Sequence, residues 1–238
     1  SYTEKGDQYE YLDIKDYYNY LDDVYSGKEI NISQVKNQKV YSHDSDQSVY
    51  ETKWKVYDCL IFETILDKTT YVFTIGDWFK VANDYAEEVE GYVEGIEDYK
   101  MNLPNCKFGE HENVYNQRVA NSYSNMISLD ANNIQYDGSS IELCDLLTID
   151  KEFIHVKKWY QSSTTSHLFA QGRISGELLL REEEFRKSSI DKINEVNSKF
   201  SNVINLKDYS TSEITIVFAL IDKDTRELHK RLPFFSKL

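Results

Sequence analysis

Two neighbouring segments, IELCDLLT at Ile141–Thr148 and FIHVKKW at Phe153–Trp159, decide how this chain is expected to fold. Both are predicted to be strands, because they are short, apolar and interrupted by polar residues. Successive strand side chains point to opposite faces, so His155 and Lys157 are expected on one face. Asp145 lies on the preceding strand. We therefore expect one carboxylate, one imidazole and one ammonium group to converge.

The residues around these strands predict an ordered series of elements. A helix is expected at Glu112–Met126, where apolar residues recur at helical spacing. Further elements are a strand around Ile134–Tyr136, a long helix over roughly Ser166–Leu180 and a last strand at Ile214–Ile221. From Glu112 onward the order is therefore helix, three strands, helix, strand.

Residues 1–105 form a separate block, which ends near Leu103-Pro104-Asn105. Its patterns predict a helix within Tyr11–Gly27, closed by Gly27, and a loop at Gln34–Ser48. They also predict strands within Trp54–Ile65 and Thr70–Val81, a hairpin turn at Asp67-Lys68-Thr69, and a helix at Asp84–Tyr99 capped by Asn83. The expected fold is α+β, with an acidic α+β module at 1–105 and an αβββαβ core at 106–238.

Composition limits the classes of protein. No apolar run approaches the roughly 18 residues that a membrane span needs, so no membrane association is expected. Cys59, Cys106 and Cys144 are far apart and form no C-x-x-C motif, which favours a reducing, cytoplasmic compartment. The chain starts at Ser1 without an apolar signal segment, so we expect it to be a piece of a longer protein.

The acidic charge is concentrated in the first block. The formal net charge is −14, and residues 1–105 contain 22 acidic residues, 10 lysines and no arginine. Residues 106–238 contain 19 acidic and 17 basic residues. This balance argues against a general nucleic-acid binder, because duplex affinity comes largely from Lys and Arg. The acidic block is either a solvated surface or a surface that binds a protein partner.

Three residues near the central strands are candidates for chemistry. A carboxylate at Asp145 within an apolar strand needs a partner or a metal, unless it lies past the strand edge in water. Lys157 can orient an attacking water and stabilise a phosphorane, or simply face solvent. His155 is either a structural residue or a ligand, and imidazole suits Mn or Zn better than Mg.

The two flanking helices contribute further polar residues. Glu112 and Asn116 share one face of the first helix and are expected to reach the same pocket. Gln171 lies on the second helix, where Gly172 and Gly176 share a face. Each glycine costs a helix roughly 1 kcal/mol relative to alanine, so we expect this helix to pack closely on a sheet or substrate.

Several segments resemble a sporadically distributed bacterial family of uncharacterised proteins. The resemblance spans most of residues 50–238 and implies no activity. It rests on GDWFKV, GEHENVYN, IELCDLL, FIHVKKW, SHLFAQGRISGELL and LPFFSKL.

The element order also resembles the core of PD-(D/E)XK nucleases over about residues 112–221. The resemblance implies that Asp145 is the metal-binding aspartate, Lys157 the motif lysine, and Glu112 the carboxylate of the first helix. Gln171 matches a helix glutamine of some branches. His155 stands where that pattern has Asp or Glu. The implied metal ligands are thus Asp145, His155 and Glu112, and the implied cofactor is a divalent metal, Mn or Mg.

The H-x-K spacing of His155 and Lys157 also begins the phospholipase-D-type nuclease signature. That signature requires an aspartate where Ser162 stands, and its downstream Gly-Ser-x-Asn partner is absent from the sequence. The expected function is therefore metal-dependent cleavage of DNA or RNA, in bacterial defence against mobile elements. The alternatives are an inactive nuclease-like fold used for binding or assembly, and an antitoxin-like partner whose acidic half covers a basic protein.

Overall fold

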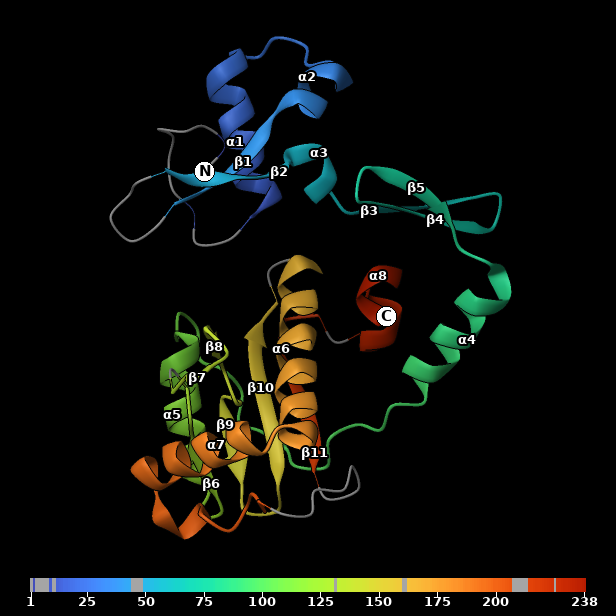
Figure 1. The fold of residues 1–238 in the computed structure, drawn as a ribbon. Coiled ribbons are helices and arrows are strands. Elements are labelled where there is room, and N and C mark those ends of the chain that lie inside the picture. The colour runs from blue at the N-terminus through green and yellow to red at the C-terminus, as the bar shows by residue number, and fades with distance from the viewer. Residues whose placement is uncertain are drawn as a thin grey trace. The chain divides into compact units, whose positions relative to one another are not determined.

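The computed structural model describes Tyr2, Tyr9 and residues 12–43, 49–130, 132–159, 162–206, 214–224 and 226–238. Helices and small sheets are mixed, which confirms the α+β class (Figure 1). The chain divides into two compact units. Unit 1 comprises Ser1–Glu94 and Pro233–Leu238, and unit 2 comprises Gly95–Leu232. This division between Glu94 and Gly95 lies upstream of the boundary at residue 105 that the sequence predicts.

Unit 1 begins with the tyrosine-rich helix α1, Ile14–Tyr25, at the predicted place. The Asp13 side chain accepts the Lys15 amide at its start, and Ser26 and Gly27 take positive φ at its end. One face of α1 supplies a small aromatic core. The buried members of this core are Tyr2, Tyr17, Leu21, Val40 and Val56.

The predicted loop at Gln34–Ser48 is wrong for the part that the structure describes. Helix α2 occupies Ile32–Asn37, because Asn31 and Gln34 cap it reciprocally. Strand β1, Lys39–His43, then pairs antiparallel with β2, Val49–Lys55. Residues 44–48 lie outside the described residues.

A three-stranded antiparallel sheet follows, in the order β3-β4-β5. Its strands are β3 (Phe62–Leu66), β4 (Thr69–Thr74) and β5 (Asp77–Lys80). The predicted turn between β3 and β4 is confirmed, with positive φ at Asp67 and Lys68. The two longer predicted strands are wrong, because α3 (Val56–Cys59) interrupts the first and a turn at Ile75 and Gly76 divides the second.

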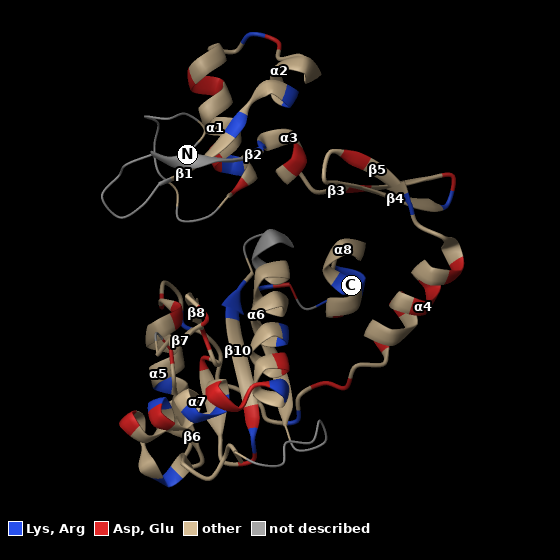
Figure 2. Cartoon of the chain, viewed as in Figure 1, with Lys and Arg blue, Asp and Glu red and all other residues tan. Residues whose placement is uncertain are grey.

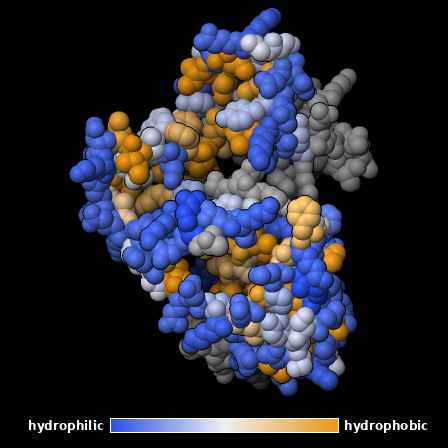
Figure 3. Space-filling view, turned by 180° about the vertical axis from the view of Figure 1, so that it is seen from behind, coloured by the Kyte–Doolittle hydropathy of each residue, from blue (hydrophilic) through white to orange (hydrophobic). Residues whose placement is uncertain are grey.

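Unit 1 also contains helix α4, Asn83–Glu94, and the short helix α8, Phe234–Lys237. Helix α4 starts with Asn83 as a helical residue and ends before Tyr99, so its predicted cap and length are wrong. Large apolar side chains of the three-stranded sheet are half or more exposed, and Figure 3 shows hydrophobic residues among hydrophilic ones at the surface. These exposed residues are Phe62, Ile65, Leu66, Ile75, Trp78 and Phe79.

Unit 2 is built on a four-stranded sheet in the order β11-β10-β9-β6. The strands are β6 (Met126–Ser128), β9 (Leu146–Thr148), β10 (Glu152–Lys158) and β11 (Thr215–Ile221). Neighbouring strands are antiparallel from β6 to β10, whereas β10 and β11 run parallel. A two-stranded hairpin of β7 (Ile134–Tyr136) and β8 (Ser139–Ile141) is inserted between β6 and β9.

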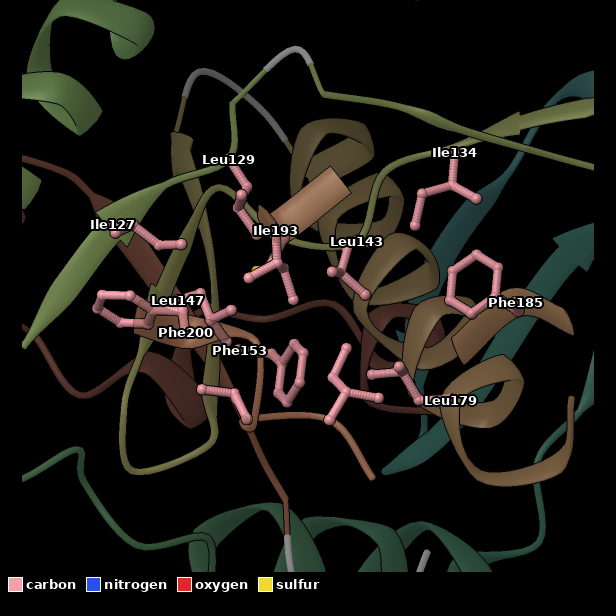
Figure 4. Close-up of a cluster of buried hydrophobic side chains, with 13 residues drawn as sticks. Ile127, Leu129, Ile134, Leu143, Leu147, Phe153, Leu179, Phe185, Ile193 and Phe200 are labelled. Carbon is pink, nitrogen blue, oxygen red and sulfur yellow. The ribbon is translucent and has the colours of Figure 1, made fainter. Parts of the chain in front are cut away.

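Helices cover both faces of this sheet, because strand side chains alternate. Helix α5, Glu112–Ser122, packs on one face, where Val119 contacts the cluster that contains Ile154 and Val156. Helices α6 (Ser162–Arg181) and α7 (Glu183–Val196) pack on the other. The labelled side chains of that second core converge between the sheet and these helices, with Phe153 and Leu179 among them (Figure 4).

Close packing of α6 confirms the prediction from its glycines. A Cβ atom on Gly172 would lie 2.4 Å from Phe218 Cε1 on β11, whereas one on Gly176 would make an ordinary 3.4 Å contact with Ile216. The absence of a side chain at Gly172 therefore lets the helix approach the edge strand. Among the described residues of this unit, short 3₁₀ helices also occur at Ser198–Phe200 and Leu228–Lys230.

Two predicted boundaries in unit 2 are wrong. Helix α5 ends at Ser122, and Met126 of the predicted helix instead starts β6. The predicted strand Ile141–Thr148 is divided, because only its first residue belongs to β8 and its last three form β9. The residues between these strands carry the candidate site.

Candidate carboxylate site

A break in one long antiparallel hairpin brings the site together. Strands β6 and β9 pair until Ser128 lies opposite Leu146, and pairing resumes where Ile134 lies opposite Ile141. The Asp137-Gly138 turn that closes the hairpin has positive φ at both residues. The two chain segments within the break face each other, and both of them contain carboxylates.

Three of these carboxylates form a cluster. Asp130, Glu142 and Asp145 each offer one oxygen, and these oxygens lie within 4.8 Å of one another. Asp145 is buried and the other two are partly buried. Among the described residues, this is the group of His, Cys, Asp or Glu side chains whose ligand atoms lie close enough together to hold one metal ion.

Asp145 is held from two sides. It immediately precedes β9, and its Oδ2 accepts a 2.7 Å hydrogen bond from the backbone N–H of Val156 on β10. Its Oδ1 accepts a 3.2 Å bond from Asn116 Nδ2 on α5. The expectation that residues around Asp145 and His155 occupy neighbouring strands of one sheet, between helices α5 and α6, is confirmed.

Gln171 reaches the cluster from α6. Its Nε2 donates a 2.9 Å hydrogen bond to Glu142 Oε2. The structure thus places the predicted residue Gln171 in contact with one carboxylate of the cluster. His167, on the same helix, is exposed.

Lys157 and Glu112 also meet at this place. Lys157 Nζ lies 3.5 Å from Glu112 Oε2, and both side chains are about one-third exposed. In Figure 2 the C-terminal end of β10 is coloured as basic. The Lys157 charge lowers the pKa of Glu142 and of Asp145, although larger effects raise both. Glu112 thus pairs with the lysine, and it lies outside the three-carboxylate cluster.

Burial and mutual repulsion make ionisation of the cluster costly. Burial raises the pKa of Asp145 to about 8, and the Glu142 carboxylate adds to this shift. Burial likewise raises the pKa of Glu142, with a further contribution from Asp130. A bound cation or a shared proton would relieve this repulsion.

The structure does not bring His155 to the carboxylates. Its ring is fully buried beneath α6, where Nε2 lies 3.3 Å from Ser175 Oγ and the ring packs beside Phe218. Burial lowers its pKa to about 4, and no neighbouring charge contributes. Among the described residues, Nδ1 has no hydrogen-bond partner. Its place within the layer between sheet and helix explains why it lies apart from Asp145, and oxygen atoms alone form the cluster.

Sequence reasoning missed Asp130 and Glu142. The Asp137-Gly138 dipeptide was the available signal, because such a pair favours a two-residue hairpin turn. A hairpin centred there and continued toward both ends places Asp130 near Asp145. The sequence patterns predict the strands at Ile134–Tyr136 and Ile141–Thr148 as separate elements, so their pairing as one hairpin was not predicted.

The site therefore lies in an α+β unit that holds clustered carboxylates beside the ends of its sheet strands, next to a lysine. The family model of a family of unknown function, DUF6119, matches residues 1–238, and the chain belongs to this family. No curated protein and no solved structure is significantly similar to the chain. Within the described residues, no helix has the length and apolar composition that a membrane span requires.

Proposed function

We propose that this protein is a metal-dependent nuclease that hydrolyses phosphodiester bonds of DNA or RNA. The observation that carries the proposal is the cluster of Asp130, Glu142 and Asp145, with the charge of Lys157 acting on it. Phosphodiester hydrolysis is promoted by divalent cations and by a positive side chain that stabilises the transition-state phosphorane. The carboxylates and the lysine match these two requirements.

The residues present fit a hard divalent cation. Carboxylate oxygens are the ligands that Mg²⁺ and Mn²⁺ take in proteins, and their positive charge would offset the repulsion within the cluster. Asp130, Glu142 and Asp145 would hold the ion. Because His155 lies outside this cluster, no imidazole ligand favours Mn²⁺ over Mg²⁺ there.

Each neighbouring residue has a definable role in this proposal. A bound cation would supply Lewis-acid polarisation of the phosphate and a more acidic water. Lys157 would hold the attacking water or the phosphate oxygens, with Glu112 fixing its ammonium group. Gln171 orients Glu142, and the Val156 amide orients Asp145. Loss of a hydrogen-bond donor that orients a metal ligand commonly lowers metal affinity tenfold to a hundredfold.

The topology of unit 2 gives further support. Helix α5, strands β6, β9 and β10, helix α6 and strand β11 occur in the αβββαβ order of the PD-(D/E)XK core, with the β7–β8 hairpin and helix α7 inserted. Strand β6 takes the place of the core strand predicted at Ile134–Tyr136. The assignment of that segment to the core is wrong, because it forms β7 of a separate two-stranded sheet. In this proposal Asp145 serves as the metal-binding aspartate and Lys157 as the motif lysine. Glu142, from the segment before β9, supplies a second carboxylate where the motif position on β10 holds His155.

The test is a cleavage assay with the full chain on linear duplex DNA, single-stranded DNA and RNA, with Mg²⁺ or Mn²⁺. Asp145→Asn and Lys157→Ala should each lower the rate by about a hundredfold or more, since each removes charge needed in the transition state. Asp150→Asn and Lys192→Ala make the same changes at surface positions and should leave the rate unchanged.

The alternative is an inactive nuclease-like fold that serves as a binding or assembly module. His155 favours it, because a buried imidazole occupies the place of the motif acid. In that case the wild-type chain would bind nucleic acid or a protein partner and cut none of the three substrates with either ion. Cleavage that is insensitive to both site variants would point to a contaminating nuclease and would contradict the proposal.

A further inference from the structure

Asn116 is the most deeply buried polar residue at the carboxylate cluster. It lies on α5, is 1% exposed, and its Nδ2 donates to Asp145 Oδ1 at 3.2 Å and to Asp130 Oδ2 at 3.4 Å. Its Oδ1, by contrast, has no hydrogen-bond partner among the described residues. One side chain thus bridges two carboxylates with its nitrogen and leaves its oxygen unsatisfied.

This arrangement is incomplete on both sides. A buried carbonyl oxygen without a donor costs about 1–3 kcal/mol, and native proteins retain few such groups. A neutral amide also offsets little of the repulsion between two carboxylates. The uncompensated carboxylates point to a missing cation, and the unpartnered Oδ1 means that the amide oxygen gives up no hydrogen bond when the amide turns toward that cation.

A half-turn of the amide would exchange its oxygen and nitrogen without moving the helix. The oxygen would then occupy the place of Nδ2, facing Asp145 and Asp130 at similar distances. Adjacent oxygens around an octahedral Mg²⁺ are roughly 3 Å apart, because each metal–oxygen bond is about 2.1 Å long. The observed 3.2 and 3.4 Å separations are close to that spacing.

We propose that Asn116 is a fourth ligand of the metal site, with its amide turning from hydrogen-bond donor to oxygen ligand when a divalent cation enters. This inference rests on the proposed function for the metal site itself. It adds a ligand from α5 and makes the set three carboxylates and one amide oxygen. Compared with a site that has an imidazole ligand, such an all-oxygen set shifts the preference from Zn²⁺ toward Mg²⁺ or Mn²⁺.

The first experiment is calorimetric titration of the full chain with Mn²⁺ and Mg²⁺, without nucleic acid. Asn116→Leu keeps the volume and removes the oxygen, so it should weaken binding by at least about tenfold. The matched control is Asn113→Leu, which makes the same change on the exposed side of α5 and should bind as the wild type does. Equal affinities of Asn116→Leu and wild type would overturn the proposal.

The second measurement needs no variant and therefore does not depend on how Asn116→Leu folds. In a crystal structure of the wild-type chain with Mn²⁺, Asn116 Oδ1 should lie about 2.2 Å from the ion. An amide more than 3 Å from a bound ion, still donating to the carboxylates, would mean that Asn116 only positions them. Absence of any ion at saturating Mn²⁺ would overturn both this inference and the proposed metal dependence.

The two proposals can fail separately. Metal binding that depends on Asn116, together with no cleavage of any substrate, would retain this inference and remove the nuclease. If cleavage depends on metal but Asn116→Leu binds the metal as tightly as wild type does, the nuclease proposal would stand and Asn116 would not be a metal ligand.

Discussion

Asp145 accepts its shortest hydrogen bond, 2.7 Å, from the backbone N–H of Val156 on the neighbouring strand. The sheet itself therefore orients this carboxylate, and no substitution at Val156 other than proline removes the donor. Because Lys157 is the next residue on β10, the same strand sets the position of the carboxylate and of the ammonium group. Their relative placement is thus a property of the β9–β10 pairing.

Replacing Asp145 should stabilise the metal-free protein at alkaline pH. The folded-state pKa of about 8 lies above the ordinary value of 3.8, so the stability tied to its protonated form is lost as pH rises from about 4 through 8. Asp145→Asn cannot ionise and should melt a few degrees higher than wild type at pH 8.5 in the presence of a chelator. The difference should shrink toward pH 5. Scanning calorimetry with Asp150→Asn as the control would measure it, and a less stable Asp145→Asn at pH 8.5 would contradict the assignment.

His155 should make the protein sensitive to mild acid. Its folded-state pKa of about 4 lies below the ordinary 6.5, so the neutral ring favours folding above pH 6.5 and this stability is lost as pH falls toward 4. The shift corresponds to roughly 3 kcal/mol. His155→Gln retains a polar group near Ser175 but does not titrate. Urea unfolding of both proteins between pH 7 and 4.5 should show a steeper loss for wild type, and parallel curves would rule out this role.

Gly172 and Gly176 should respond oppositely to alanine. Gly172→Ala forces the Phe218 ring and Ile216 to move and should destabilise the chain by about 1–3 kcal/mol. Gly176→Ala makes only ordinary contacts and should gain up to about 1 kcal/mol from helix propensity. Denaturant titration measures both changes. Adding Phe218→Leu should rescue part of the first loss, and no rescue would mean that the clash is not its cause.

Gln171 should affect metal binding through Glu142. Gln171→Leu removes the 2.9 Å hydrogen bond that orients this carboxylate and should weaken Mn²⁺ binding by roughly tenfold. Gln135→Leu, on the exposed hairpin strand, provides the same change away from the cluster. Calorimetry distinguishes the two, and a loss of equal size in both variants would show a non-specific effect.

Helices α5 and α6 and strands β10 and β11 of unit 2 follow from the sequence, because their patterns reflect local burial, whereas β6 and α7 were not predicted. The apolar alternation of β10, the helical spacing of α5 and the glycines of α6 each describe one element facing one core. In unit 1 the turn at Asp67 and Lys68 was also predictable, whereas α2 and α3 were not. These helices have six and four residues, and so few residues leave only a weak periodic signal in the sequence.

Asp145 and Lys157 could be singled out from the sequence, since both are polar residues next to buried strands. Only the tertiary structure decided their partners. Asp130 and Glu142 lie in irregular segments, and the break in hairpin pairing that brings them to Asp145 depends on contacts between residues distant in the chain. The period-2 rule placed His155 and Lys157 on one face, but it could not foresee that α6 covers only the first. Local patterns predict on which face of its strand a side chain lies, and tertiary packing decides which residues that side chain contacts.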